Sequence, residues 1–82
     1  MNEVWGMQEK ARGVLQAAAV EAYGRAGMYV IMDQLMSRAN LSDPEEFRAI
    51  AEYLEEKGWI AEADPDYTIF VLTPEGIDKA MN

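Results

Sequence analysis

Residues 42–76 read SDPEEFRAIAEYLEEKGWIAEADPDYTIFVLTPEG, and the order of signals in this stretch decides the fold. A helix start comes first, followed by an apolar helical pattern and a glycine that ends it. Two short apolar stretches then flank an acidic turn, and a second helix start follows. A helical period next to short β-rich stretches indicates an α+β fold, with a helix, a β-hairpin and a further helix in that order.

The first helix of this stretch is predicted over residues 43–57. Its start can be capped in two registers, each pairing a serine or aspartate with a glutamate three residues on, so that side chains satisfy the free amides of the first turn. The two pairs are Ser42 with Glu45 and Asp43 with Glu46. Apolar residues then recur at three- and four-residue spacing and predict one buried helix face.

A β-hairpin is predicted after Gly58, because glycine commonly ends a helix in the left-handed conformation. Its strands are expected over residues 59–63 and 67–72, around the turn-forming sequence Asp64-Pro65-Asp66. Thr73 then caps a short final helix that has a proline at its first position. The core is expected to contain Leu35, Leu41, Phe47, Ile50, Leu54, Ile60, Ile69, Val71 and Ile77.

The upstream part of the chain predicts two helices separated by a glycine-marked break. Residues 1–27 read as a long, alanine-rich helix and the break, and residues 28–38 as a second helix. Gly13 weakens the first helix by up to about 1 kcal/mol unless another chain packs close to it. The second helix is expected to bury Tyr29, Met32, Leu35 and Met36, and Asn40 to close it in a left-handed conformation.

Composition predicts one soluble domain over residues 1–82. Half of the residues are hydrophobic, there is no cysteine, and no apolar run approaches the ~20 residues that span a bilayer. The first ten residues lack the basic and apolar regions of a signal peptide. We therefore expect no membrane association, and a cytoplasmic protein is the simplest interpretation.

The stretch ANLSDPEEFRAIAEYLEEKGWI, residues 39–60, resembles the turn and third helix of a bacterial winged helix-turn-helix domain. The residues that carry the resemblance are Leu41, Ser42, Leu54, Glu55, Glu56, Lys57, Gly58, Trp59 and Ile60. Residues 71–80, VLTPEGIDKA, resemble the second wing strand and the following helix of that family. Over residues 28–80 the resemblance implies a winged-helix fold, with three helices, a two-stranded β-hairpin wing and a short C-terminal helix.

The resemblance also implies DNA binding through the third helix, but the charges here oppose it. Between Asp43 and Asp66 the chain has nine acidic residues against only Arg48 and Lys57, which accounts for most of its net charge of −8. Such a surface repels phosphate, whose neutralisation supplies most non-specific affinity for DNA. The prediction is therefore a protein-interaction or regulatory module that does not bind DNA through this helix.

The acidic residues have two readings, a solvated face that keeps the domain soluble or a docking surface for a basic protein partner. They are Glu45, Glu46, Glu52, Glu55, Glu56, Glu62, Asp64 and Asp66. The alternative function is a DNA-binding transcriptional regulator, in which Arg48 is the candidate nucleic-acid contact. A separate basic patch of Lys10, Arg12, Arg25 and Arg38 would also allow DNA binding.

No catalytic or metal-binding constellation stands out. The chain has no histidine, no cysteine and no glycine-rich phosphate loop, so we expect no enzyme and no cofactor. The turn Asp64-Pro65-Asp66 offers too few oxygens for calcium, so no metal is expected. Trp5 and Trp59 are interpreted as packing residues rather than as ligand-stacking ones.

The first helix has more apolar surface than one small core would need, which predicts a homodimer through that helix. The candidate dimer face consists of Val4, Trp5, Met7, Val14 and Leu15. The alternative is that this stripe packs on its own domain.

Overall fold

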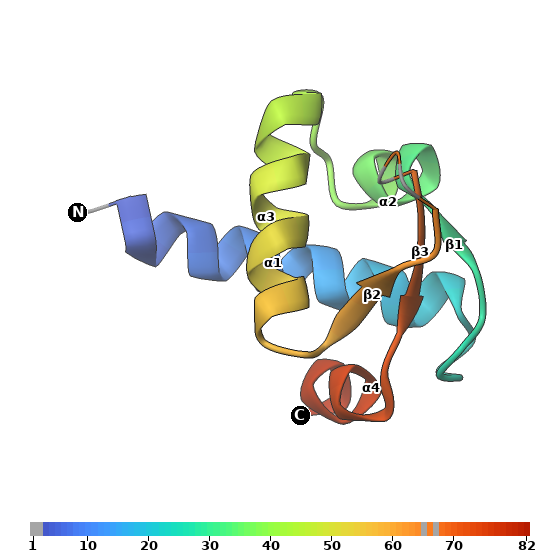
Figure 1. Ribbon diagram of the computed structural model, residues 1–82. Helices are drawn as coiled ribbons and strands as arrows, with labels where there is room; N and C mark the ends of the chain where they lie inside the picture. The colour runs from blue at the N-terminus through green and yellow to red at the C-terminus, as the bar shows by residue number, and fades with distance from the viewer. Residues whose placement is uncertain (1–2, 65, 67) are drawn as a thin grey trace.

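The computed structural model describes residues 3–64, 66 and 68–82, and for residues 3–5 it describes the backbone alone. The elements follow in the order α1 (Glu3–Glu21), β1 (Val30–Ile31), α2 (Met32–Arg38), α3 (Pro44–Glu56), β2 (Ile60–Glu62), β3 (Ile69–Leu72) and α4 (Pro74–Met81). In the part of the chain so described, four helices pack together with one small antiparallel sheet at their side (Figure 1). The expected α+β class is confirmed.

Helix α1 is the packing surface for the other three helices. It contacts α2, α3 and α4, and in Figure 1 it passes behind α3. Its buried side chains are mostly alanine, and such small residues let neighbouring helices approach closely. They are Ala11, Val14, Leu15, Ala17, Ala18 and Ala19, and Ala22 is buried directly after the helix. The centre of α1 therefore packs within its own domain, which was the alternative interpretation of the apolar stripe.

Helix α3 begins and ends where local sequence signals place it. Asp43 is the N-cap, and its carboxylate accepts a hydrogen bond from the Glu45 amide at 3.0 Å. Of the two predicted N-caps, Asp43 is therefore the one that forms, and Ser42 lies outside the helix, but the Glu46 carboxylate that was predicted to pair with Asp43 forms an ion pair with Lys10 instead. Lys57 is the C-cap, and Gly58 follows with a φ of 79°, so the predicted bounds are confirmed. The buried face of α3 consists of Phe47, Ile50, Ala51 and Leu54.

The sheet has three strands in the order β1-β3-β2, whereas the sequence predicted a two-stranded hairpin. The additional strand is Val30–Ile31, which pairs antiparallel with β3. The predicted second helix is correspondingly shorter, since the Met32 amide donates to the Thr68 carbonyl at 2.8 Å. Tyr29 precedes this strand with 74 % of its surface exposed, so its predicted burial was wrong.

The strand register determines which side chains lie on the inner face of the sheet. Val30 lies opposite Phe70 and Ile60 opposite Leu72, and all four side chains are buried. Ile69 and Val71 were expected in the core, but they lie on the other face and are only half-buried. The rings of Phe47 and Phe70 meet edge to face with centroids 5.7 Å apart, which joins α3 to the sheet.

Helix α4 is fixed to the end of α3 by a capping residue and a close backbone approach. The Thr73 hydroxyl accepts from the Gly76 amide at 3.0 Å and donates to the Gly58 carbonyl at 2.6 Å. The Thr73 amide donates to the Trp59 carbonyl at 3.1 Å. A Cβ on Gly76 would lie 1.8 Å from that carbonyl oxygen, so only glycine fits here. These contacts hold Trp59 between α3 and α4.

None of the helices described here combines the length and the apolar character that a membrane span requires.

Candidate functional site

The exposed face of α3 is acidic, with one arginine among its glutamates. Glu45, Glu52 and Glu56 are exposed together with Arg48, because they lie opposite the buried face of the helix. Carboxylates at this spacing form a negative stripe along the solvent side of the helix. We name Glu45, Glu52 and Glu56 the α3 acidic face.

Two of the predicted surface glutamates interact with other residues of the same chain. Glu46 forms an ion pair with Lys10 on α1. The Glu55 carboxylate accepts from the Glu62 amide at 3.4 Å, which places it against the β2 strand. These two side chains link α3 to its neighbours, so they contribute less to a free docking surface than their position in the sequence suggested.

The three acidic residues of the hairpin differ in role. The Asp64 carboxylate accepts from the Thr68 hydroxyl at 2.6 Å and from the amides of Thr68 and Ile69 at 3.0 Å. These bonds, that of the Thr68 hydroxyl foremost, hold the pKa of Asp64 below its ordinary value. Asp64 is thus a turn residue, whereas Asp66 is exposed. Pro65 and Tyr67, which belong to the predicted turn and strand, lie outside the described residues.

Glu62 is the electrostatically unfavourable member of the hairpin. Its Oε2 atom is buried without a hydrogen-bond partner among the described residues. Desolvation raises the pKa of Glu62, and the nearby charges of Glu55 and Asp64 raise it further. The described residues nevertheless contain no group of three acidic, histidine or cysteine side chains arranged to hold a metal ion.

The predicted dimer face is only partly available. Val14 and Leu15 are 2 % and 1 % exposed in the core of a single chain, so they cannot form a dimer face in this fold. Met7 is half-buried, and the side chains of Val4 and Trp5 lie outside the described residues. Among the described residues, five large apolar side chains are exposed elsewhere, and three of them, Val20, Tyr23 and Met81, line a hollow where the end of α1 meets α4.

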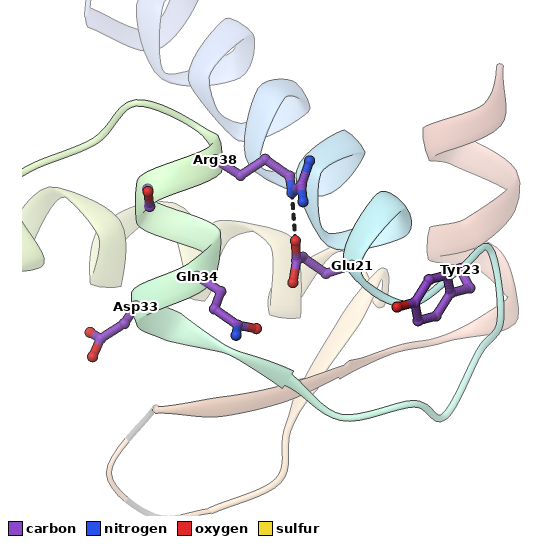
Figure 2. A pocket seen from close by; sticks show the side chains of 6 residues that line it. Glu21, Tyr23, Asp33, Gln34 and Arg38 are labelled. Carbon is purple, nitrogen blue, oxygen red and sulfur yellow. Dashed lines mark hydrogen bonds and ion pairs between the residues drawn. The ribbon is translucent and has the colours of Figure 1, made fainter.

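A second hollow, shown in Figure 2, lies between the end of α1 and α2. Arg38 and Glu21 point toward one another across it, and the Arg38 Nε lies 2.6 Å from the Glu21 Oε2. Asp33 points away from this pair, and Tyr23 is 80 % exposed at the rim. The arginine charge is neutralised internally, so this hollow presents no free cation to a ligand.

The third hollow combines cations with aromatic rings, and we name it the basic-aromatic pocket. It encloses about 440 Å³ between α1, the end of α3, the turn before β2, and α4. Its lining residues are Gln8, Ala11, Arg12, Leu15, Tyr53, Lys57, Trp59 and Lys79. Three of the chain's seven basic residues therefore meet at one place, and no acidic side chain is among the residues that line it.

The two lysines of the basic-aromatic pocket are placed against its rings. The Lys57 Nζ lies 5.5 Å from the centre of the Tyr53 ring, and the Lys79 Nζ lies 5.3 Å from that of the Trp59 ring. The two rings meet edge to face with centroids 6.5 Å apart. Trp59 was expected to be a packing residue, and it does pack against the core, but it also forms a wall of this pocket.

The four basic residues that the sequence suggested as a separate patch do not form one continuous surface. Lys10 and Arg38 are each held in an ion pair, and of the four residues only Arg12 lines the basic-aromatic pocket. Sequence reasoning missed this pocket because its cations come from α1, the C-cap of α3, and α4. The one local signal was the close succession of Lys57 and Trp59 after a helix.

Comparisons with models of known protein families, with curated proteins and with solved structures find no match to this chain.

Proposed function

We propose that this protein is a winged-helix-type interaction module that binds a basic protein surface through the α3 acidic face, and not duplex DNA. Apart from the additional strand β1, the order of three helices, a β-hairpin and a short final helix is the one that the sequence resemblance implies, which supports the winged-helix assignment. Fold alone carries no function, so the proposal rests on the chemistry of α3.

The observation that carries the proposal is the exposure of Glu45, Glu52 and Glu56 around a single arginine. In a winged helix this helix would enter the major groove. Carboxylates there meet phosphates of the same sign, and each approach is unfavourable. Arg48 can make one contact to a base or phosphate, which does not offset three glutamates. The same stripe is complementary to lysine- and arginine-rich surfaces.

The DNA half of the proposal is tested by fluorescence anisotropy with a random-sequence duplex at about 50 mM salt, where electrostatic binding is strongest. We expect no binding tighter than about 10 μM, a value in the range of ordinary non-specific binding. Tighter binding that is lost in Arg48→Ala would favour the alternative, a DNA-binding transcriptional regulator, since Arg48 is exposed on the same face.

The protein half is tested with a fluorescent lysine- and arginine-rich peptide and two triple variants of equal net charge. Neutralising the α3 acidic face with Glu45→Gln, Glu52→Gln and Glu56→Gln should weaken peptide binding about tenfold or more. The matched control, Glu9→Gln, Glu75→Gln and Asp78→Asn, changes exposed residues of α1 and α4 by the same total charge. Equal weakening in both variants would mean that only net charge matters, which contradicts a docking surface on α3.

A further inference from the structure

We propose that the basic-aromatic pocket binds a small organic monoanion, in which one carboxylate is attached to a flat apolar body. This site is separate from the α3 acidic face, and its ligand has the opposite charge to the partner proposed for that face. The proposal follows from the charges, the rings and the floor of the pocket, taken in turn.

The lysines of the pocket form no ion pair with an acidic side chain among the described residues. Acidic residues outnumber basic ones by 15 to 7 in this chain, yet no carboxylate lines the pocket. The ion pairs among the described residues are Lys10 with Glu46 and Arg38 with Glu21, and both lie elsewhere. The Arg12 Nη2 lies 3.5 Å from the main-chain oxygen of Asn82, so Arg12 already has one contact. An incoming anion therefore finds Lys57 and Lys79 without a competing acidic side chain among the residues that line the pocket.

The aromatic rings of the pocket hold the two lysines in position without neutralising their charge. A cation over an aromatic face is attracted by the ring quadrupole, worth about 0.5–1 kcal/mol at an exposed site, and it keeps its full charge. Tyr53 and Trp59 thus hold Lys57 and Lys79 at one pocket. The same rings are half-buried and offer apolar surface to a flat ligand.

The floor and the size of the pocket favour a compact ligand. Ala11 and Leu15 form an apolar floor, and both are 1 % exposed, so this part of the pocket is fixed by the core. A volume of about 440 Å³ falls within the range of sites for small molecules. Gln8 at the rim can donate or accept a hydrogen bond, which would help to orient a polar group.

The charge of the whole chain favours a single carboxylate over a polyanion. With a net charge of −8, long-range repulsion opposes nucleic acids and strongly acidic peptides. That repulsion is screened beyond about 8 Å at physiological salt, so a monoanion experiences mainly the nearby cations. Because α4 is held against Trp59 by Gly76 and Thr73, the pocket wall is already in place before a ligand binds.

The experiment uses naphthalene-2-carboxylate as the probe and naphthalene-2-carboxamide as its neutral match. Binding is measured by calorimetry and by two-dimensional NMR in a Trp5→Phe background, where the indole signal of Trp59 is the only one that remains. We expect the carboxylate to bind about tenfold or more tightly than the carboxamide, as charge-assisted bonds would require. The shifted NMR signals should belong to Trp59 and to residues that line the pocket.

Two variants test the cations. Lys57→Met with Lys79→Met should weaken carboxylate binding about tenfold or more and leave carboxamide binding nearly unchanged. The matched control is Arg25→Met with Arg48→Met, which removes the same two charges at exposed residues that do not line the pocket. It should change the affinity by less than about twofold, because distant exposed charges are screened.

Several results would overturn the proposal. They are equal affinity for the two probes, no saturable binding at millimolar concentration, or signal shifts confined to the hollow at Val20, Tyr23 and Met81. Displacement of the probe by a short duplex would assign the pocket to nucleic acid instead. The triple glutamine variant of the α3 acidic face should retain probe binding, so this test fails or succeeds independently of the peptide test.

Discussion

Gly76 is the residue whose identity the packing constrains most directly. Alanine is favoured over glycine in a helix by up to about 1 kcal/mol, so helix propensity alone would make Gly76→Ala stabilising. A Cβ here would lie 1.8 Å from the Trp59 carbonyl oxygen, so the start of α4 must move. We expect Gly76→Ala to lower the free energy of unfolding by about 1–3 kcal/mol, as overpacking does. Urea denaturation measures this change, and a stabilised variant would contradict it.

Glu62 should give the protein a measurable pH dependence. Its pKa in the folded state is raised above the ordinary 4.5, so its unfavourable contribution is complete at neutral pH and is relieved as the pH falls toward 4.5. Glu62→Gln should therefore be more stable than the wild type at neutral pH, and the difference should shrink as the pH falls through the raised pKa and disappear below about 4.5. Urea midpoints across this pH range test the expectation, and a constant difference would contradict it.

Asp64 provides the control of opposite sign. Its pKa is held below 3.8, so its favourable contribution is present at neutral pH and is lost as the pH falls through the lowered value. Asp64→Asn should be less stable than the wild type at neutral pH. As the pH falls, this difference should still be present at about pH 4.5, where the difference between Glu62→Gln and the wild type has disappeared.

At the scale of single elements, α1 contains an exposed glycine that the core does not require. Among the described residues, and apart from the adjacent backbone of α1 itself, no atom lies within 4 Å of a Cβ placed on Gly13. Gly13→Ala should therefore raise the stability by about 0.5–1 kcal/mol, the usual difference between the two residues in a helix. It also serves as the matched control for Gly76→Ala. If sedimentation shows a dimer that this change disrupts, a second copy packs against Gly13, as the sequence allowed.

Helix α3 depends on its buried face, and Leu54 lies near the end of that face with no exposed surface. Leu54→Ala should cost about 2–5 kcal/mol, the usual range for a truncated core leucine. The comparison change is Ala49→Ser on the exposed side of the same helix, which should have a small effect. A nearly silent Leu54→Ala in chemical denaturation would contradict the observed orientation of α3.

The elements differ in how far the sequence predicts them, for a physical reason. The bounds of α3 are set by neighbours in the sequence, namely the Asp43 cap and the left-handed Gly58, so they could be predicted. The strand Val30–Ile31 could not, because two residues become a strand only by pairing with β3. The same non-local assembly hid the basic-aromatic pocket, whose Arg12 and Lys79 meet only in the fold.

At the scale of the whole molecule, the net charge of −8 should make stability depend on salt. Like charges repel more strongly in the compact state than in the unfolded chain, and salt screens that repulsion. The urea midpoint should therefore rise between about 20 and 200 mM sodium chloride, over which the Debye length falls severalfold. The triple glutamine variant of the α3 acidic face should show a smaller rise. A midpoint that falls with salt would mean that the ion pairs outweigh the repulsion.

The packing of α4 against α1 also has a consequence for synthesis. The alanine-rich side of α1 is translated first, but one of the helices that cover it follows after all the strands. Until α4 has left the ribosome, a nascent chain exposes part of that apolar side, as well as the part of β3 that α4 contacts. We therefore expect the domain to close only after α4 has emerged, and in one step, with chaperone contacts concentrated on α1 during the interval.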